Sequence, residues 1–310
     1  MAGLRTHSAL VCSKGCVRGN NEDNFYFQGD YMRLKEEDEG AHILQKYESN
    51  KQLYAIMDGM GGEAQGERAA YLTVKLMSQM APEILAGKTA EKLDQFARKA
   101  TDLVYKDGLK DNPGHQGTTM AALALIGKTA YVANVGDSRV YLLRGGRLRM
   151  LSQDHTTVYK MRLAGALTSE QARKHPRGNV ISQYIGMDAA SLPKDYVYQN
   201  SISLCRDDRL MLCSDGASDL IPEDQIEDIL SHEVTADAAA CQIVETALML
   251  GGKDNTTCIV VDVTDGKLPE ARRESKDDED DMTTQYTRAS DRSRGLPALR
   301  GGFSLARMIG

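Results

Sequence analysis

The sequence predicts an α+β protein with an antiparallel sheet arrangement and helices on its outer side. Runs of β-prone residues occur in groups along the chain and do not alternate one by one with helices, which argues against a parallel sheet. Two long segments, 63–85 and 90–109, carry apolar residues at helical spacing and follow each other directly. Such stripes are typical of helices that pack on a sheet.

The first part of the chain contains short strands joined by polar segments. The loop Ser13–Asp23 is rich in Gly and Asn, and the polar segment Asp30–Asn50 is expected to form an exposed connection. The expected strands of this part are 7–13, 24–28 and Gln52–Met57. The third strand ends at Asp58, and three glycines follow within four positions before the first predicted helix begins.

The second part of the chain is dominated by short β-prone runs separated by glycine-containing turns. The turns at 127–128, 136–138 and 145–146 are typical of hairpins. The expected strands are Thr118–Ile126, Thr129–Val135, Arg139–Leu143, Leu148–Leu151, Ser201–Leu204, Arg209–Cys213 and Cys258–Val263. Helices are expected near Ser169–Lys174, at 222–231 and at 235–250.

Composition and charge exclude several classes of protein. The 310 residues include 41% hydrophobic and 26% charged residues, which is ordinary for a globular protein. The net charge of −6 argues against nucleic acid as the main partner. No apolar run approaches the roughly 20 residues that span a bilayer, and the start lacks the apolar stretch of a secretory signal. We expect a cytoplasmic monomer without a membrane span.

The end of the chain differs in composition from the rest. Beyond Asp265, a charge block at Lys276–Asp281 precedes residues rich in Ser, Thr and Arg. This composition predicts one domain over residues 1–265 and a disordered tail over 266–310. The tail is either a tether or phosphorylatable regulatory segment, or a dispensable end.

The six cysteines suggest a reducing environment. They form no C-x-x-C pair, and four of them stand in apolar runs. We interpret them as reduced core thiols of a cytoplasmic protein, so the sequence predicts neither a disulfide framework nor a zinc site.

Acidic residues stand beside glycine at the ends of several predicted strands. These acids are Asp58, Asp137, Asp215 and Asp254, and Glu22 and Asp23 precede a further strand. A single Asp of this kind is most often a turn former or a helix cap. Six acids at strand edges are able to meet at one end of a sheet, where each would raise the pKa of the others.

Hard divalent cations are the usual compensation for such a group of carboxylates. Mg²⁺ and Mn²⁺ prefer carboxylate, carbonyl and water oxygens. Two such ions about 3.5–4 Å apart activate a water and polarise a phosphoryl oxygen. Arg18 lies four residues before Glu22. Its guanidinium serves either as a structural ion pair or as a bidentate ligand for a phosphate substrate.

Three other sequence patterns would indicate a different kind of active or binding site. Cys12 and Arg18 fit the C-x5-R outline of a thiol phosphatase, but Val11 stands where a His is expected and nearby acids would raise the thiol pKa. Residues 59–64 match G-x-G-x-x-A, yet Asp58 and Glu63 would face a pyrophosphate and a second helix follows the first. A Walker A sequence is absent.

An ordered set of short sequence motifs resembles one known family. The set is Arg18-Gly-Asn-Asn-Glu22-Asp23, Met57-Asp58-Gly-Met-Gly-Gly62, Gly117-Thr-Thr119, Gly136-Asp-Ser-Arg139, Ser214-Asp-Gly216 with Asp219, and Asp254-Asn255. It resembles the signature of the metal-dependent protein Ser/Thr phosphatases, the protein phosphatase 2C family, in its bacterial form. The resemblance covers about residues 5–264. It implies a central β-sandwich of two antiparallel sheets flanked by helix pairs, in α-β-β-α layers, with a mobile flap at about 155–188.

The resemblance also implies a role for each matching residue. Asp58 bridges two Mn²⁺ or Mg²⁺ ions, the Gly59 carbonyl binds the second ion, Asp215 and Asp254 bind the first, Glu22 and Asp23 hold bound waters, Arg18 grips the phosphate, and Asp137, Asp215 and Asp219 match a third, weaker metal site. Met60 departs from many animal members, which carry a His proposed as the proton donor at this position. The general acid is therefore unassigned, and Ile181–Gly186 in the flap departs from the commoner version as well.

The leading hypothesis is an Mn²⁺/Mg²⁺-dependent phosphatase of phosphoserine and phosphothreonine in phosphoproteins that opposes a bacterial Ser/Thr kinase. A catalytically silent binding module is the alternative from a different class. It would lack some of the carboxylates, whereas this chain has all of them. A thiol phosphatase would depend on Cys12 instead of a metal.

Overall fold

The computed structural model describes residues 3–34, 40–61, 65–111, 116–168, 171, 175–176 and 180–270. All of them belong to one compact unit, Met1–Ala271. The strands are β1 (Arg5–Ser13), β2 (Asp23–Phe27), β3 (Ala41–Glu48), β4 (Lys51–Met60), β5 (Gly117–Thr118), β6 (Met120–Ile126), β7 (Thr129–Val135), β8 (Arg139–Arg144), β9 (Arg147–Met150), β10 (Tyr198–Ser203), β11 (Arg209–Cys213) and β12 (Thr256–Val263). The helices are α1 (Gln65–Ile84), α2 (Thr89–Asp111), α3 (Thr157–Leu163), the 3-10 helix η1 (Ala189–Ser191), α5 (Asp215–Ser218), α6 (Glu223–His232) and α7 (Ala236–Met249).

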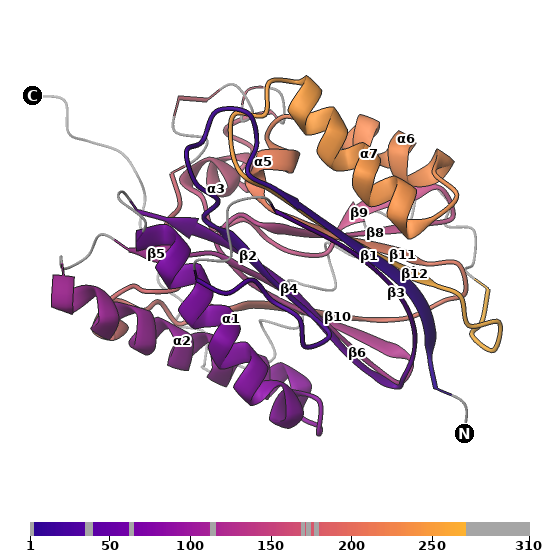
Figure 1. The fold of residues 1–310 in the computed structure, drawn as a ribbon, viewed down its shortest axis with the longest axis horizontal. Coiled ribbons are helices and arrows are strands. Elements are labelled where there is room, and N and C mark those ends of the chain that lie inside the picture. The colour runs from indigo at the N-terminus through magenta and orange to yellow at the C-terminus, as the bar shows by residue number, and fades with distance from the viewer. Residues whose placement is uncertain are drawn as a thin grey trace, which may run out of the picture. The chain divides into compact units, whose positions relative to one another are not determined.

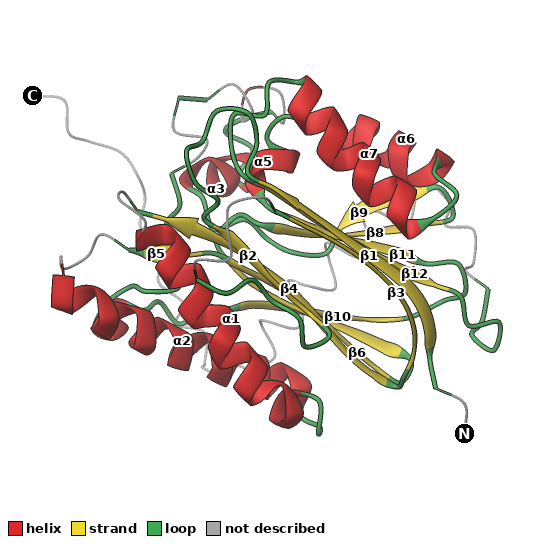
Figure 2. Ribbon diagram, in the orientation of Figure 1, coloured by secondary structure: helices red, strands yellow, loops and turns green. Residues whose placement is uncertain are grey.

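The strands form two antiparallel sheets that lie face to face. One sheet has the order β3-β1-β12-β11-β8-β9, and the other has the order β10-β7-β6-β4-β2, with β5 paired to β4 (Figure 2). An aliphatic core between the sheets includes Leu10, Phe27, Leu123 and Leu212, all fully buried. Burial of such side chains removes apolar surface from water at about 25 cal/mol per Å², so this layer is a main source of stability.

Helices cover the outer face of each sheet. α1 and α2 pack on β4, β6 and β7 through buried residues such as Val74 and Phe96 (Figure 1). α6 and α7 pack on the other sheet through residues such as Ile229 and Ile243, next to Met211 and Val260 of the strands. The predicted α+β architecture, a β-sandwich in α-β-β-α layers, is therefore confirmed.

Two details of the predicted organisation are wrong. Residues 30–50 were expected to be a connection, but they contain β3, which pairs with β1 along the edge of its sheet. The residues of β3 are largely polar because its outer face is exposed. The turn at 136–138 was expected to close a hairpin, but β7 and β8 belong to different sheets. Turn residues indicate a reversal of the chain, and the packing of the following strand decides which sheet it joins.

The sheet register brings several strand ends to one end of the sandwich. Asp23, at the start of β2, lies opposite Asp58, near the end of β4. In the other sheet, the end of β11 lies opposite the start of β12, with Cys213 paired to Cys258. The expected helix near Ser169–Lys174 lies outside the described residues except for Gln171, which is helical. Within the described chain, no helix is long and apolar enough to cross a membrane.

Candidate metal centre

Asp23 links the two sheets at this end of the sandwich. One of its oxygens, Oδ2, accepts hydrogen bonds from Ser214 Oγ at 2.8 Å and from Thr257 Oγ1 at 2.6 Å. Thr257 lies on β12 of the opposite sheet, and Ser214 directly follows β11 of that sheet. The other oxygen, Oδ1, is buried and has no hydrogen-bond partner among the residues that the structure describes. Burial raises the pKa of Asp23 to about 7, and the charges of Asp254 and Glu22 add to the shift.

Asp58 and Asp215 meet across the space between the sheets. Asp58 stands near the end of β4, and Asp215 is the first residue of α5, directly after β11 and Ser214. The Asp58 and Asp215 carboxyls are close enough that each affects the pKa of the other. Burial, followed by the charge of Asp215, holds the pKa of Asp58 well above its usual range, and burial raises the pKa of Asp215 to about 7. Neighbouring buried carboxyls whose charged forms are disfavoured are a group that a bound cation stabilises.

The charge on Asp23 makes the stability of the metal-free chain depend on pH. A carboxyl whose pKa is raised on folding stabilises the fold at low pH, and this contribution is lost as the pH rises through the folded value of about 7. We expect the metal-free Asp23→Asn variant to gain about 2 kcal/mol of unfolding free energy over the parent chain between pH 5.5 and 7.5. Urea unfolding in EDTA measures this gain.

His155 changes the stability with pH in the direction opposite to Asp23, and the difference between Asp23→Asn and the parent chain removes this contribution. Burial lowers the pKa of His155 to about 4, so this residue destabilises the fold as the pH falls below its unfolded value of about 6.5. Both chains contain His155, and its contribution cancels in their difference. If the free energy of unfolding changed with pH in the same way in the parent chain and in Asp23→Asn, the raised pKa of Asp23 would be contradicted.

Asp137 lies in the connection that crosses from β7 to β8. Its side chain is buried, and within the described part of the chain its Oδ1 has no hydrogen-bond partner. Burial together with the charge of Asp215 holds its pKa well above the usual range. Asp219, one turn further along the chain than Asp215, is exposed, and its charge raises the pKa of both Asp215 and Asp137. The structure therefore brings Asp137, Asp215 and Asp219 close enough for their charges to interact.

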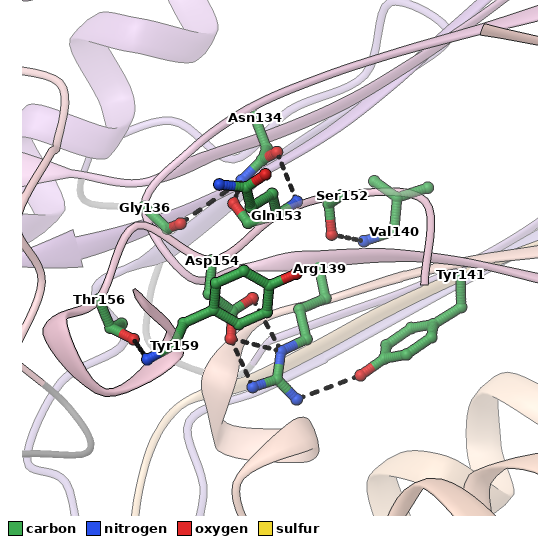
Figure 3. Close-up of polar contacts among 10 residues, drawn as sticks. All are labelled: Asn134, Gly136, Arg139, Val140, Tyr141, Ser152, Gln153, Asp154, Thr156 and Tyr159. Carbon is green, nitrogen blue, oxygen red and sulfur yellow. Dashed lines mark hydrogen bonds and ion pairs between the residues drawn. The ribbon is translucent and has the colours of Figure 1, made fainter. Parts of the chain in front are cut away.

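A buried ion pair supports the connection that holds Asp137. Arg139 donates to Asp154 through Nε at 3.0 Å and Nη2 at 2.7 Å, and through Nη1 to Tyr141 Oη at 3.2 Å (Figure 3). Asn134 holds the same stretch of chain, because its amide donates to the Gln153 carbonyl at 2.7 Å and its Oδ1 accepts from the Gln153 N–H at 3.1 Å. These contacts fasten the segment around Asp154 to β7 and β8, on both sides of Asp137.

Arg18 and Asp254 form the solvent-exposed rim of the acidic cluster, by which we mean Glu22, Asp23, Asp58, Asp137, Asp215 and Asp254. Arg18 Nη2 donates to Asp254 Oδ2 at 2.6 Å, and the side chains remain 50% and 34% exposed. This hydrogen bond, with the further charges of Glu22 and Asp215, raises the pKa of Arg18. Burial raises the pKa of Glu22, although Arg18 opposes the shift. The guanidinium is thus a solvent-accessible positive charge on the exposed side of the acidic cluster.

Two glycines allow the chain segments of the cluster to approach one another. A Cβ on Gly59 would lie 2.3 Å from the Gly66 carbonyl oxygen and 2.6 Å from that of Glu22. A Cβ on Gly216 would lie 2.0 Å from the carbonyl oxygen of Asn255. Any side chain at either position would therefore push apart the loops that carry Glu22, Asp58, Asp215 and Asp254.

The donor set of this cluster fits hard divalent cations. It consists of carboxylates from six predicted acids, and the buried Oδ1 atoms of Asp23 and Asp137 lack any hydrogen-bond donor in the described structure. Oxygen donors with uncompensated negative charge are the ligands that Mg²⁺ and Mn²⁺ prefer. Among the described residues, no three of these acids bring one oxygen each within 4.8 Å of one another. The described acids therefore surround this end of the sandwich without closing on one point.

The thiol alternative does not fit the surroundings of Cys12. The side chain is 4% exposed, its sulfur accepts a hydrogen bond from Asn21 Nδ2 at 3.3 Å, and Thr257 Oγ1 lies 3.1 Å from the sulfur. Burial and the charge of Asp23 raise its pKa to about 12, so the thiolate that a nucleophile requires is scarce at neutral pH. The dinucleotide alternative lacks its second strand, because α2 follows α1.

Both ends of the predicted flap, 155–188, are hydrogen-bonded to the neighbourhood of the cluster. His155 N donates to the Gly136 carbonyl at 2.8 Å, and Gly136 N donates to His155 Nδ1 at 3.3 Å. Near the other end, Ile185 and Thr118 exchange two backbone hydrogen bonds at 2.8 and 3.0 Å. Thr118 also donates through its hydroxyl to the Asp58 carbonyl at 2.9 Å. The flap is therefore joined to the chain segments that hold Asp58 and Asp137.

Several residues that position the cluster were not singled out from the sequence. Asn255 accepts from the Glu22 N–H at 2.8 Å and donates to the carbonyls of Lys14 and Asn20 at 2.9 Å, so it holds the loop before β2. Thr119 Oγ1 accepts from the Asp58 N–H at 3.0 Å. Ser214, Thr119 and Asn255 stand inside the quoted sequence motifs, so proximity to the acids was a usable signal. Thr257 and Asp154 had no such signal.

Comparison with known proteins places this geometry in context. The sequence model of the family described as Protein phosphatase 2C matches residues 34–250. The Serine/threonine phosphatase stp of Listeria welshimeri is 31% identical over 262 residues, which cover 83% of this chain and 95% of that protein. The Serine/threonine protein phosphatase PstP of Mycobacterium tuberculosis is 30% identical over 258 residues, which cover 83% of this chain and 45% of that protein.

Solved structures are similar in fold. The crystal structure of the M. tuberculosis phosphatase PstP/Ppp superimposes with a TM-score of 0.70 at 28% identity and covers 84% of this chain and 100% of that chain. The structure of the PstP catalytic domain in complex with two manganese ions has a TM-score of 0.68 at 28% identity, with the same coverage of 84% and 100%.

Proposed function

The chain belongs to the protein phosphatase 2C family, and on this premise we propose that it hydrolyses phosphoserine and phosphothreonine in phosphoproteins with two Mn²⁺ or Mg²⁺ ions as cofactors. The observation that carries the proposal is the group of acids from both sheets at one end of the sandwich. Within it, Asp23 has a buried oxygen without a donor and a pKa raised to about 7.

The residues assigned to the ions are those that the family resemblance indicates. We propose that Asp58 bridges the two ions, that the Gly59 carbonyl binds the second, that Asp215 and Asp254 bind the first, that Glu22 and Asp23 bind through water, and that Asp137, Asp215 and Asp219 form a third, weaker site. When bound, two such ions supply an activated water for attack on phosphorus and polarise a phosphoryl oxygen.

The protein prepares this centre by holding the acids in place. Ser214 and Thr257 donate to one oxygen of Asp23 and leave the other available for a ligand. Thr119 fixes the backbone of Asp58 on both sides, because its hydroxyl accepts from Asp58 N–H and its N–H donates to the Asp58 carbonyl at 2.8 Å. Preorganised ligands need no rearrangement during the reaction, which is the main source of electrostatic catalysis.

Arg18 is assigned to the phosphate group of the substrate. Its guanidinium is half-exposed at the rim and is held by Asp254, itself a proposed metal ligand. If Asp254 held a cation, its hydrogen bond to Arg18 would weaken and more of the guanidinium would be available to a phosphoryl oxygen. The planar fork of Arg matches a phosphate with two parallel hydrogen bonds. Met60 supplies no proton for the leaving group.

Arg18→Ala tests this assignment. We expect kcat/KM for a phosphoserine peptide to fall by about 10–100-fold, mostly through KM, because a charge-assisted hydrogen-bond pair to the substrate is lost. Arg18→Lys should recover part of the loss, since it restores the charge but not the fork. Steady-state kinetics with saturating Mn²⁺ provide the measurement, and a KM equal to that of the parent chain would contradict the assignment.

Removal of the metal tests the proposed function itself. The full chain with Mn²⁺ is expected to release phosphate from a phosphoserine peptide and from p-nitrophenyl phosphate. EDTA should reduce the rate to below about 1%, because the attacking water then loses its activation. Cys12→Ser should leave the rate unchanged. Turnover that survives EDTA would overturn the metal mechanism, and no turnover with bound Mn²⁺ would identify a silent binding module.

We also propose the setting in which the phosphatase works. Its substrates are phosphoproteins made by a bacterial Ser/Thr kinase, and its compartment is the cytoplasm, which is consistent with six free cysteines. We propose that residues 1–265 carry the phosphatase activity; residues 266–270 still belong to the compact unit, where Leu268 is buried in the core. Comparison of phosphoproteomes with and without the active protein tests the substrate class, and a shortened chain ending at Asp265 that lost its activity would contradict the domain boundary.

A further inference from the structure

Three potential metal ligands meet on the surface of the sheet that α7 covers. His42 lies on β3, and Asp237 and Cys241 lie on the first turns of α7. His42 Nε2 is 2.6 Å from Asp237 Oδ1 and 3.8 Å from Cys241 Sγ. One ligand atom from each residue lies within 4.8 Å of the other two. We refer to these three residues as the β3–α7 cluster.

The fold explains why the three side chains converge. Asp237 and Cys241 are four residues apart on α7, so they occupy the same face of the helix. Along β3, Ala41 and Ile43 pack against the core between the sheets. His42 therefore points to the opposite side, where α7 lies. The cluster joins an edge strand to a helix that begins nearly 200 residues later in the chain.

The ligand chemistry differs from that of the acidic centre. The candidate metal centre offers oxygen atoms, whereas the β3–α7 cluster offers one nitrogen, one sulfur and one oxygen. Imidazole and thiolate ligands favour Zn²⁺ over Mg²⁺ or Mn²⁺. We propose that His42, Asp237 and Cys241 bind one Zn²⁺ ion, with solvent as the fourth ligand. This site revises the sequence-based expectation that the protein has no zinc site, because the three ligands are too far apart in the sequence to form a recognisable pattern.

The separations in the cluster are close to those that a tetrahedral site requires. Standard Zn–N, Zn–O and Zn–S lengths place two such ligands about 3.4 Å apart for N and O and about 3.6 Å apart for N and S. The observed N–S distance of 3.8 Å fits directly. The observed N–O distance of 2.6 Å is a hydrogen bond between His42 and Asp237, which opens by less than about 1 Å to admit the ion.

The half-exposed side chains permit this adjustment. His42 and Asp237 are 54% and 34% exposed, and Cys241 is partly buried. Burial, Asp237 and Glu245 raise the pKa of Cys241, so the thiol stays protonated until a cation compensates the negative charge. A bound ion would connect the exposed edge strand β3 to α7. The fold would then be stabilised at an edge where hydrogen bonds are satisfied on one side only.

Cobalt substitution in the full chain provides the test. The chain is stripped with a chelator, its acidic centre is saturated with Mn²⁺, and Co²⁺ is then titrated. We expect one equivalent of Co²⁺ to produce a near-ultraviolet thiolate-to-metal charge-transfer band, which a site of oxygen and nitrogen ligands cannot produce. Added Zn²⁺ should remove the band by displacement. Failure to develop the band at any Co²⁺ concentration would overturn the proposal.

Variants then assign the band to the cluster. Cys241→Ser should abolish it, and His42→Gln and Asp237→Asn should weaken Co²⁺ binding by about 10-fold or more. Cys205→Ser is the matched control, because Cys205 is also a free, partly buried cysteine but lies outside the cluster. We expect the control to keep the full band. A band that survives Cys241→Ser would place the metal elsewhere and contradict the proposal.

A second measurement uses the unmodified sequence and does not depend on the folding of a variant. Zn²⁺ in excess over Mn²⁺-saturated protein should slow alkylation of Cys241 by N-ethylmaleimide, read by peptide mass spectrometry, and leave the rate at Cys205 unchanged. At about 100-fold excess over its Kd, Zn²⁺ should raise Tm by about 5 °C more in the parent chain than in Cys241→Ser. Equal alkylation of Cys241 with and without Zn²⁺ would overturn the site.

Discussion

Asp58→Asn is expected to lower Mn²⁺-dependent kcat/KM for a phosphoserine peptide by at least about 10³-fold, equivalent to about 4 kcal/mol of transition-state stabilisation. Asp58 lies opposite Asp23 in the register of β2 and β4, and the charge of Asp215 helps to raise its pKa. The amide of Asn keeps the shape of the side chain but removes its negative charge and one oxygen ligand. The measurement is steady-state phosphate release at saturating Mn²⁺.

A stability measurement separates this loss of function from a loss of fold. In the metal-free parent chain, burial and the charges of Asp215, Asp23 and Asp137 raise the pKa of Asp58, so folding disfavours the ionised form that this residue adopts when unfolded. Asp58→Asn should therefore unfold at a higher urea concentration than the parent chain in EDTA at pH 7.5, while Mn²⁺ should stabilise it less. Asp228→Asn, on the exposed face of α6, makes the same chemical change outside the centre and should leave the rate unchanged. Retention of more than a tenth of the rate by Asp58→Asn would contradict its assigned role.

Arg139→Gln is expected to lower the free energy of unfolding by about 3–5 kcal/mol. Asp154 is 3% exposed and accepts three hydrogen bonds from the Arg139 guanidinium. Without that guanidinium, a carboxylate stays buried with its main compensation removed, and Tyr141 Oη loses a donor as well. Urea unfolding of the parent chain and the variant at pH 7.5 gives the difference.

A double-mutant cycle identifies the cause of this loss. The pair Arg139→Gln and Asp154→Asn removes both charges, so it should recover more than half of the loss caused by the single change. Arg98→Gln breaks the exposed pair with Asp94 on α2, which is 41% and 34% exposed, and should cost less than about 1 kcal/mol. Additive losses at Arg139 and Asp154 would show that the buried pair does not act as a unit.

The chemistry of the candidate centre was visible in the sequence because acids stood at the ends of apolar runs. Asp58, Asp215 and Asp254 stand where β4 ends, where β11 has just ended and where β12 is about to start. The strand pattern therefore predicted that they lie at sheet edges. The error at residues 136–138 has a physical reason, since Gly136 and Asp137 mark a turn in either a hairpin or a crossover. The chain crosses to the other sheet there, and this crossover carries Asp137 to the acids of both sheets.

The sequence by itself determined the period of most strands and of the long helices, the α+β class and the identity of the acids, because these depend on side-chain type and local spacing. The tertiary structure decided which side chains face each other. Asp23 meets Ser214 and Thr257 from 191 and 234 residues away, and His42 meets Cys241 across 199 residues. Such contacts depend on the order and register of strands and on the packing of two sheets. These arise from the burial of the whole core, and no local pattern encodes them.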